Sequence, residues 1–170
     1  MSDHRLIITG SREYDDAAAI YATLDRVLYA LSGQDSQGCL FLIHGEQERL
    51  SLPVLPEQIA ARWAQERIGE GLPVIEEVYP ADWKGPCVLE CTHFERVMFR
   101  GVSLCPQAGE RANAQMAAVN PGTALACLRP GSKSTRARDC LRRLHRLGIP
   151  FEVVVQGEAR GLPHDLLSRG

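Results

Sequence analysis

The sequence predicts an α/β protein built on a Rossmann-like, doubly wound parallel sheet of about five strands. Short apolar runs alternate with segments whose apolar residues recur at helical spacing. Right-handed crossovers then place helices on both faces of such a sheet. A cysteine-rich segment, GPCVLECTHFERVMFRGVSLCP at residues 85–106, interrupts this alternation. We expect one domain over residues 1–156, with a cysteine-rich insertion at 84–106 and a C-terminal tail at 157–170.

The five expected strands are apolar runs that stop at turn residues or at proline. They are Arg5–Thr9, Cys39–Ile43, Val74–Tyr79, Ala124–Leu128 and Phe151–Val155. Numbered along the chain, a doubly wound connection favours the order 3-2-1-4-5. This order reverses between the first and fourth strands, so the switch point is expected there.

Four helices are expected between these strands. The first follows Asp15 and Asp16, the second begins near Glu57, the third is 109–118, and the fourth follows residues 129–135. A polar loop at 33–38 and an irregular segment at 46–57 separate the earlier elements. The inner helix faces are predicted to include Ile59, Ala60, Trp63, Ala64 and Ile68 in the second helix, and Ala137, Cys140, Leu141, Leu144 and Leu147 in the fourth.

Two loops converge on the predicted switch point, where doubly wound sheets bind their ligands. Residues 10–12 (GSR) follow the first strand, and residues 130–135 (PGSKST) follow the fourth. Glycine lets the backbone approach a ligand, and free amides at a helix start favour an anion. Arg12, Lys133 and the loop hydroxyls add donors. Each loop alone is also typical of a turn or cap, but together they predict a site for a phosphate or ribose phosphate.

Ordered motifs along the chain resemble the YspA/YpsA-related branch of the SLOG superfamily, which includes the LOG phosphoribohydrolases and the DprA (Smf) DNA-processing proteins. The motifs are GSREYDD, HG, IAARWA, VYPADW, AGERANAQM, PGSKST and LGIPFEV. The resemblance implies a bacterial or phage domain that binds a nucleotide or nucleotide-derived ligand. Together with the loops, it indicates as binding residues Gly10, Ser11, Arg12, His44, Gly45, Gly109, Asn113, Gly131, Ser132, Ser134 and Thr135.

The chain departs from the LOG pattern where that pattern carries catalysis. The PGGxGTxxE motif is PGSKSTRAR here, so Arg138 stands at the position of the catalytic glutamate. Asp139 is adjacent, but on a helix it projects about 100° away from that position. We therefore expect ligand binding rather than turnover. The alternative is an enzyme that cleaves an N-glycosidic bond, with His44, Glu57 or Asp139 as its catalytic candidates.

The cysteine-rich segment predicts a structural zinc site. Its spacing is Cys87-x3-Cys91-x-His93, with Cys105 after eleven intervening residues. Three thiolates and one imidazole make a closed tetrahedral zinc site. The segment has little apolar material of its own, so a metal would supply the order that a core supplies elsewhere. It also resembles the cysteine-bearing stretch of a subset of YspA-like sequences.

Alternatives to this zinc site stay open at the level of sequence. Glu90 or Glu95 could replace His93 as the fourth ligand, and two of the three cysteines could form a disulfide. All three cysteines of the segment are expected outside the core, because the surrounding loop is polar. The chain's other cysteines, Cys39, Cys127 and Cys140, are expected to be small buried residues.

The formal net charge of −2 provides no general attraction to nucleic acid or to an anionic membrane. Arg138, Arg142 and Arg146 recur at four-residue intervals, a pattern typical of a solvated helix face, with a DNA-associated module as a second alternative. The apolar runs are too short for a signal peptide or a membrane span. We expect a cytoplasmic protein, where thiols stay reduced, and leave a homo-oligomer open.

Overall fold

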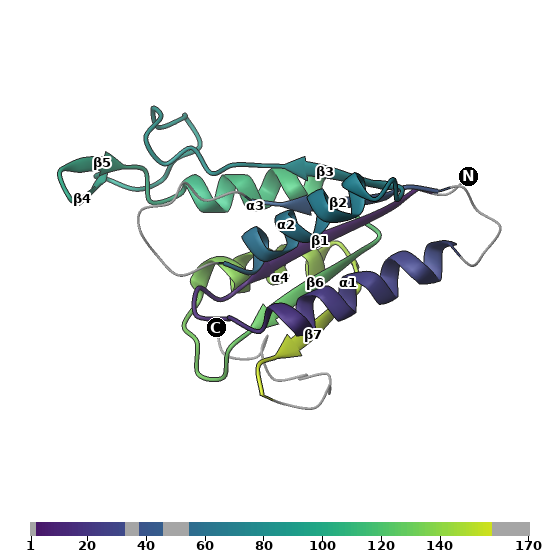
Figure 1. The fold of residues 1–170 in the computed structure, drawn as a ribbon. Helices are drawn as coiled ribbons and strands as arrows, with labels where there is room; N and C mark the ends of the chain where they lie inside the picture. Colours follow the sequence, from purple (N-terminus) through teal and green to yellow (C-terminus); the bar gives the residue numbers. More distant parts are fainter. Residues whose placement is uncertain (1–2, 33–37, 46–54, 158–170) are drawn as a thin grey trace.

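The computed structural model describes residues 3–32, 38–45 and 55–157 of the 170-residue chain. Most of the expected polar loop at 33–38 and of the expected irregular segment at 46–57 lies outside the described residues, as does the tail from residue 158. A parallel sheet forms the centre of the molecule, with helices on both faces (Figure 1). No helix in the described ranges combines the length and apolar character that crossing a membrane requires.

The central sheet has the predicted topology. Its strands are β1 (His4–Gly10), β2 (Leu40–His44), β3 (Val74–Val78), β6 (Thr123–Leu128) and β7 (Phe151–Val155). They run in the order β3-β2-β1-β6-β7, and every neighbouring pair is parallel. With the two short strands of the insertion left aside, this is the order 3-2-1-4-5. The switch point therefore falls between β1 and β6, as expected.

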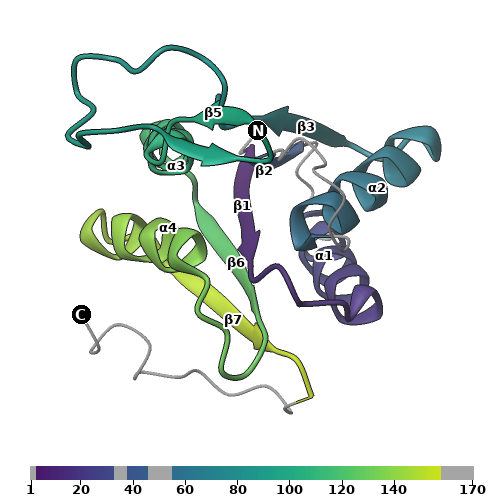
Figure 2. The ribbon, with the colours of Figure 1, turned by 90° about the vertical axis from the view of Figure 1, so that its left-hand side faces the viewer.

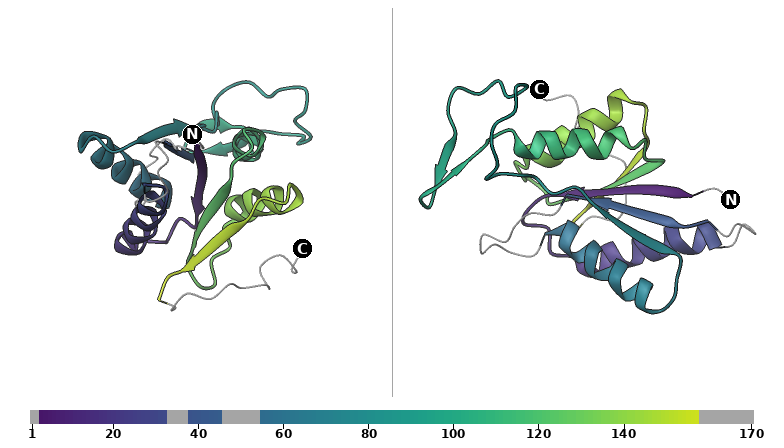
Figure 3. Two further views of the ribbon diagram at one scale, coloured as in Figure 1. Left: turned by 90° about the vertical axis from the view of Figure 1, so that its right-hand side faces the viewer. Right: turned by 90° about the horizontal axis from the view of Figure 1, so that it is seen from above.

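Helices pack in pairs on opposite faces of the sheet. α1 (Ala17–Ser32) and α2 (Pro56–Gly69) cover one face, and α3 (Ala108–Ala118) and α4 (Thr135–Arg146) cover the other (Figures 2 and 3). Apolar residues of α1 and α2 pack with the strands around Trp63, which is fully buried. This confirms the helical periodicity that predicted both pairs.

Two residues assigned to inner helix faces are exposed instead. Ile68 is 45% exposed and Leu147 is 60% exposed. Ile68 lies in the last turn of α2, and Leu147 is the residue at which α4 ends. Both predictions were wrong because the apolar periodicity continues to the end of each helix, whereas the buried residues of α2 and α4 end at Ala64 and Leu144.

The insertion contains a β-hairpin that the sequence did not reveal. β4 (Val97–Phe99) pairs antiparallel with β5 (Val102–Leu104). The two turn residues, Arg100 and Gly101, have φ values of 48° and 78°. Positive φ at both central residues is the pattern of a type I′ turn, which matches the twist of a two-residue hairpin. Arg-Gly is a weak signal for that turn, and the flanking strands are only three residues long.

Cysteine burial differs from expectation at two positions. Cys105 was expected outside the core, but it is fully buried in a small apolar cluster with Ala81, Ala108 and Ala112. The cluster forms because α3 begins just after Cys105 and covers it. Cys39 was expected to be buried, but it precedes β2 and is only half-buried. Burial of Cys127 and Cys140 is confirmed.

Candidate ligand pocket and metal site

A pocket of about 260 Å³ opens beside the loops that follow β1 and β6. These loops leave the carboxyl ends of adjacent strands at the switch point. The lining residues are Arg12, Glu13, Ser132, Lys133, Ser134, Thr135 and Arg136. Three cationic side chains face one carboxylate, and the first turn of α4 forms part of the wall. The pocket therefore offers charge and amide groups suited to an anion.

Ser11 joins the two loops. Its side chain is fully buried, and its Oγ accepts a hydrogen bond from the backbone N–H of Arg129 at 2.9 Å. Its own N–H donates to the carbonyl of Cys127 at 2.9 Å. Ser11 thus fixes the distance between the β1 and β6 loops, and it is not one of the residues that line the pocket.

Turn and cap roles account for part of the PGSKST loop. Gly131 has a φ of 73°, a backbone conformation that favours glycine. Ser134 is the N-cap of α4, and its Oγ accepts from the N–H of Ala137 at 3.4 Å. Ser132 Oγ accepts from the N–H of Ser134 at 3.3 Å. These hydroxyls shape the loop, while Thr135 remains exposed in the pocket wall.

Three predicted binding glycines lie against protein atoms. A Cβ on Gly10 would come within 2.5 Å of the Cys127 carbonyl, and one on Gly109 would lie 3.0 Å from the ring of Trp83. A Cβ on Gly45 would lie 2.7 Å from Nη2 of Arg136. Close packing against the backbone thus requires glycine at position 10, whereas at Gly45 the nearest atom is the end of the flexible Arg136 side chain. The role of these glycines in ligand contact stays a prediction.

Arg136 reaches across the crevice from the first turn of α4. Its Nη2 donates to the carbonyl of Gly45 at 3.1 Å and lies 3.5 Å from Oε1 of Glu57. The sequence analysis did not assign Arg136 to the crevice, so this role was missed. Long side chains in helices lean toward the N-terminus, so a first-turn position is the signal that could have revealed it. By contrast, Arg138, Arg142 and Arg146 are exposed, as expected of a solvated face.

Glu57 is a buried carboxyl at the start of α2, with only 3% of its surface exposed. Burial raises its pKa, while the positive charge of Arg136 is the largest effect that opposes this rise. The nearby His44 and the backbone amide of Gly10 also favour the ionised form. Oε2 of Glu57 has no hydrogen-bond partner among the described residues. The group therefore resists ionisation and has an oxygen free for a further contact.

Two more buried polar side chains line this part of the fold. His44, at the end of β2, places Nε2 2.8 Å from Oε1 of Glu76, and its Nδ1 is unpartnered within the described ranges. Asn113 on α3 donates through Nδ2 to Oδ2 of Asp139 at 2.9 Å and to the carbonyl of Arg136 at 3.1 Å. Its Oδ1 likewise lacks a partner in the described part of the chain.

Asp139 holds two helices together. Its Oδ2 accepts from Asn113 on α3 and from Arg143 Nε on α4, the latter at 2.8 Å. Both donors already engage this carboxylate oxygen, so Asp139 has a structural role between α3 and α4. Glu57 is the better placed of the two carboxyl candidates.

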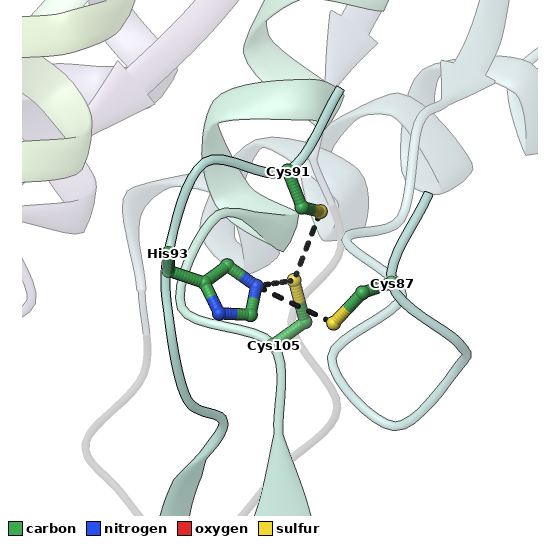
Figure 4. A group of neighbouring side chains, drawn as sticks. All are labelled: Cys87, Cys91, His93 and Cys105. Atoms are coloured by element: carbon green, nitrogen blue, oxygen red, sulfur yellow. Dashed lines mark hydrogen bonds between the residues drawn. The ribbon is translucent and has the colours of Figure 1, made fainter. Parts of the chain in front are cut away.

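The four predicted metal ligands come together in the insertion (Figure 4). The ligand atoms of Cys87, Cys91, His93 and Cys105 all lie within 4.8 Å of one another. Nε2 of His93 is 3.3 Å from both Cys87 Sγ and Cys105 Sγ, and Cys91 Sγ is 3.7 Å from Cys105 Sγ. All three thiols are free of disulfides. This cluster could hold a metal ion.

Hydrogen bonding orients the ring of His93. Its Nδ1 lies 2.9 Å from the backbone carbonyl of Glu95, which can only accept. The proton therefore sits on Nδ1, and Nε2 directs a lone pair at the cysteines, as a metal ligand requires. Glu95 thus contributes its backbone to the site, and His93 is the fourth member of the cluster.

Two arginines surround the thiols with positive charge. Nη1 of Arg111 donates to Cys91 Sγ at 3.0 Å and to Cys105 Sγ at 3.2 Å. Nη1 of Arg96 donates to Cys87 Sγ at 3.3 Å. Burial by itself raises the pKa of Cys105, but hydrogen bonds, with that from Arg111 the strongest, outweigh burial and lower the pKa to about 6. Arg111 therefore favours the thiolate form of Cys105, whereas burial raises the pKa of the neighbouring Cys91.

Arg96 also holds the insertion in shape. Its guanidinium donates to the carbonyls of Trp83 at 3.1 Å, Gly85 at 2.6 Å and Ser103 at 2.9 Å. These carbonyls belong to the start of the insertion and to β5. One side chain thus ties both arms of the insertion together beside Cys87.

These observations define a Rossmann-like α/β protein with a crevice lined by cationic side chains at its switch point and a three-cysteine, one-histidine cluster in its insertion. Residues 4–85 match the model of the YspA, cpYpsA-related SLOG family. This match supports the resemblance to the YspA-related SLOG branch that the motifs indicated. The match ends before Cys87, so the cysteine cluster lies outside it. A comparison with curated proteins gave no match.

Proposed function

We propose that this protein binds a nucleotide or nucleotide-derived ligand in the crevice between β1 and β6. The observation that carries this proposal is the cationic pocket formed by the loops after these two strands. Arg12 and Lys133 would receive a phosphate group, together with the free amides at the start of α4. The match of residues 4–85 to the YspA, cpYpsA-related SLOG family supports the nucleotide part of this assignment.

The buried polar groups suit the remainder of such a ligand. Glu57, His44 and Asn113 each keep one buried atom without a partner among the described residues. Buried polar atoms are normally paired, and an unpaired one is costly. Ribose hydroxyls and base edges carry both donors and acceptors, so a nucleoside could satisfy these three atoms. Arg136 lies between them and the phosphate end of the pocket.

The experiment that tests this proposal is a thermal-shift panel of nucleotides with the purified protein. A ligand that binds only the folded state raises the unfolding temperature in proportion to its concentration over Kd. Mass spectrometry of small molecules released from the denatured protein would identify a ligand that copurifies. If no nucleotide shifts the transition and nothing is released, the binding proposal loses its support.

We further propose that the cysteine cluster binds a structural zinc ion. Zinc–sulfur bonds of about 2.3 Å and zinc–nitrogen bonds of about 2.0–2.1 Å place the ligand atoms of a tetrahedron about 3.6–3.8 Å apart. The observed separations of 3.3 Å and 3.7 Å are close to these values. Zinc with three thiolates and one imidazole carries a net charge of about −1, which the neighbouring guanidinium groups of Arg96 and Arg111 would stabilise. Four protein ligands leave no open position, so the role is structural.

Metal analysis tests the zinc proposal directly. Protein purified without chelators should contain one zinc per chain, and Cys91→Ser should lose it. Cys140→Ser is the matched control, because Cys140 is a buried thiol outside the cluster. Metal-free wild-type protein whose Cys87, Cys91 and Cys105 are all readily alkylated would contradict a zinc site.

The second candidate function is cleavage of an N-glycosidic bond. The observation in its favour is Glu57, whose burial raises its pKa toward the range of a general acid. Against it, Arg138 occupies the position of the LOG catalytic glutamate. Nucleoside monophosphates should therefore release little or no free base. Turnover that disappears in Glu57→Gln would make the enzyme the better description.

A further inference from the structure

Exposed apolar side chains gather in the insertion. Val88, Leu89, Phe94, Val97, Met98 and Phe99 are between 41% and 106% exposed. The rest of the described surface exposes only five large apolar side chains, on α1, α2, β3 and the end of α4. The hairpin itself projects beyond the end of α3 (Figure 1). A two-stranded ribbon that stands apart with apolar side chains is marginally stable without further strands or packing.

The hairpin register leaves one edge of β4 open. Phe99 and Val102 flank a two-residue turn and therefore exchange both of their backbone hydrogen bonds. Hydrogen-bonded and non-hydrogen-bonded pairs alternate along an antiparallel ladder. Met98 and Ser103 are therefore a pair that exchanges no backbone hydrogen bonds. The N–H and C=O of Met98 consequently point to the outer edge of the hairpin. Such an edge is a template for another strand.

We propose that β4 is the contact strand of a homodimer. Two copies would pair β4 with β4, antiparallel, about a two-fold axis at Met98, and would form a four-stranded sheet from two hairpins. The contact is isologous, so it closes at two copies. This proposal is independent of the ligand and of the metal that the protein binds.

The sequence of β4 favours a second copy over another partner. Pairing Val-Met-Phe with itself places Val97 opposite Phe99 of the second copy, and Met98 opposite Met98. Aromatic pairs with β-branched residues stabilise neighbouring strands. The pairing also places Arg100 opposite Arg96 of the second copy. These charges do not meet, because Arg96 is bound to the carbonyls of its own insertion and the guanidinium of Arg100 lies over the ring of Phe99, 5.4 Å from its centroid.

The size of the contact predicts a weak dimer. A standard interface takes roughly 800 Å² from each partner, more than a three-residue strand provides. Leu89 and Phe94 are fully exposed on the same insertion and add apolar surface, since an aromatic side chain contributes on the order of 150–250 Å². The projecting hairpins would let two copies meet without collision of their α/β bodies (Figure 3). We therefore expect a dimer with a Kd in the micromolar range.

Analytical ultracentrifugation of the full chain across the micromolar range tests the dimer. Wild-type protein should pass from monomer to dimer, and Met98→Lys should remain monomeric because it places a charge at the paired edge. Tyr29→Lys is the matched control, since Tyr29 is 69% exposed on α1 and Met98 is 65% exposed. Equal metal content and circular dichroism in all three proteins would exclude misfolding.

A cysteine at position 98 tests the register itself. Cα atoms of a hydrogen-bonded antiparallel pair lie about 5.5 Å apart, within the range of a disulfide. Met98→Cys should form a disulfide-linked dimer when oxidised glutathione accepts the two electrons, and Tyr29→Cys should not exceed the wild-type background. A wild-type protein that stays monomeric, or a dimer that Met98→Lys leaves intact, overturns the proposal. Binding of a foreign peptide at β4 of a monomer would do the same.

Discussion

Arg136 and Glu57 meet across the crevice, with Nη2 of the arginine 3.5 Å from Oε1 of the glutamate. One comes from the first turn of α4 and the other from the first turn of α2, which lie on opposite faces of the sheet. The contact therefore spans the switch point between the strands. Since Arg136 also lines the pocket, a bound anion and the Glu57 carboxylate would share one cation.

The buried Glu57 should make stability depend on pH. Its pKa is raised in the folded protein, mainly by burial, above the ordinary value of 4.5. The stability that the protonated carboxyl contributes is therefore fully present below pH 4.5. It is lost as the pH rises through the pKa of Glu57 in the folded protein. As the pH increases above 4.5, wild-type protein should therefore lose stability relative to Glu57→Gln. Urea unfolding at a series of pH values measures the difference.

Glu110→Gln controls for the loss of one negative charge, because Glu110 is exposed on α3. A difference between wild type and Glu57→Gln that does not change between acidic and neutral pH would contradict the raised pKa of Glu57.

Arg12 should contribute to phosphate affinity more than other exposed arginines. It lines the pocket from the β1 loop, whereas Arg142 is exposed on α4 outside the lining. A hydrogen bond to a charged group is worth about 1.5–3 kcal/mol. Arg12→Ala should therefore raise the Kd of a phosphate-bearing nucleotide about 10- to 150-fold, while Arg142→Ala leaves it nearly unchanged. Calorimetric titration of both variants gives the comparison, and equal losses would instead favour a diffuse basic face.

The strands and their order could be predicted from sequence because each one is a short, continuous apolar run. Ligand types and spacing likewise identified the four residues of the cysteine cluster. Three features could not be predicted. The hairpin has strands too short to show a period, Arg136 has its role through a contact with a distant helix, and Cys105 is buried by a helix that follows it. Each depends on tertiary packing rather than on local pattern.

Metal removal should loosen the insertion first. The central sheet has a large apolar core of its own, whereas the insertion contributes only the small cluster around Cys105. Regions with few buried contacts open at lower free energy. Chelation should therefore speed amide hydrogen exchange in residues 85–106 and leave exchange in β1 and β6 slow. Simultaneous loss of protection in the sheet would show that the metal supports the whole domain.

Arg111 should strengthen metal binding although it is not a ligand. Its Nη1 donates to both Cys91 Sγ and Cys105 Sγ, and it projects from α3, the helix that also carries Asn113. Groups that hydrogen-bond metal ligands typically change metal affinity 10- to 100-fold. Arg111→Met should therefore lower zinc affinity by about that factor in competition with a chromogenic chelator. Arg111→Lys should restore part of it, because an ammonium keeps the charge but loses the fixed geometry of the guanidinium. Equal affinity in wild type and Arg111→Met would mean that the four ligands alone set the affinity, and that the thiolates need no neighbouring cation.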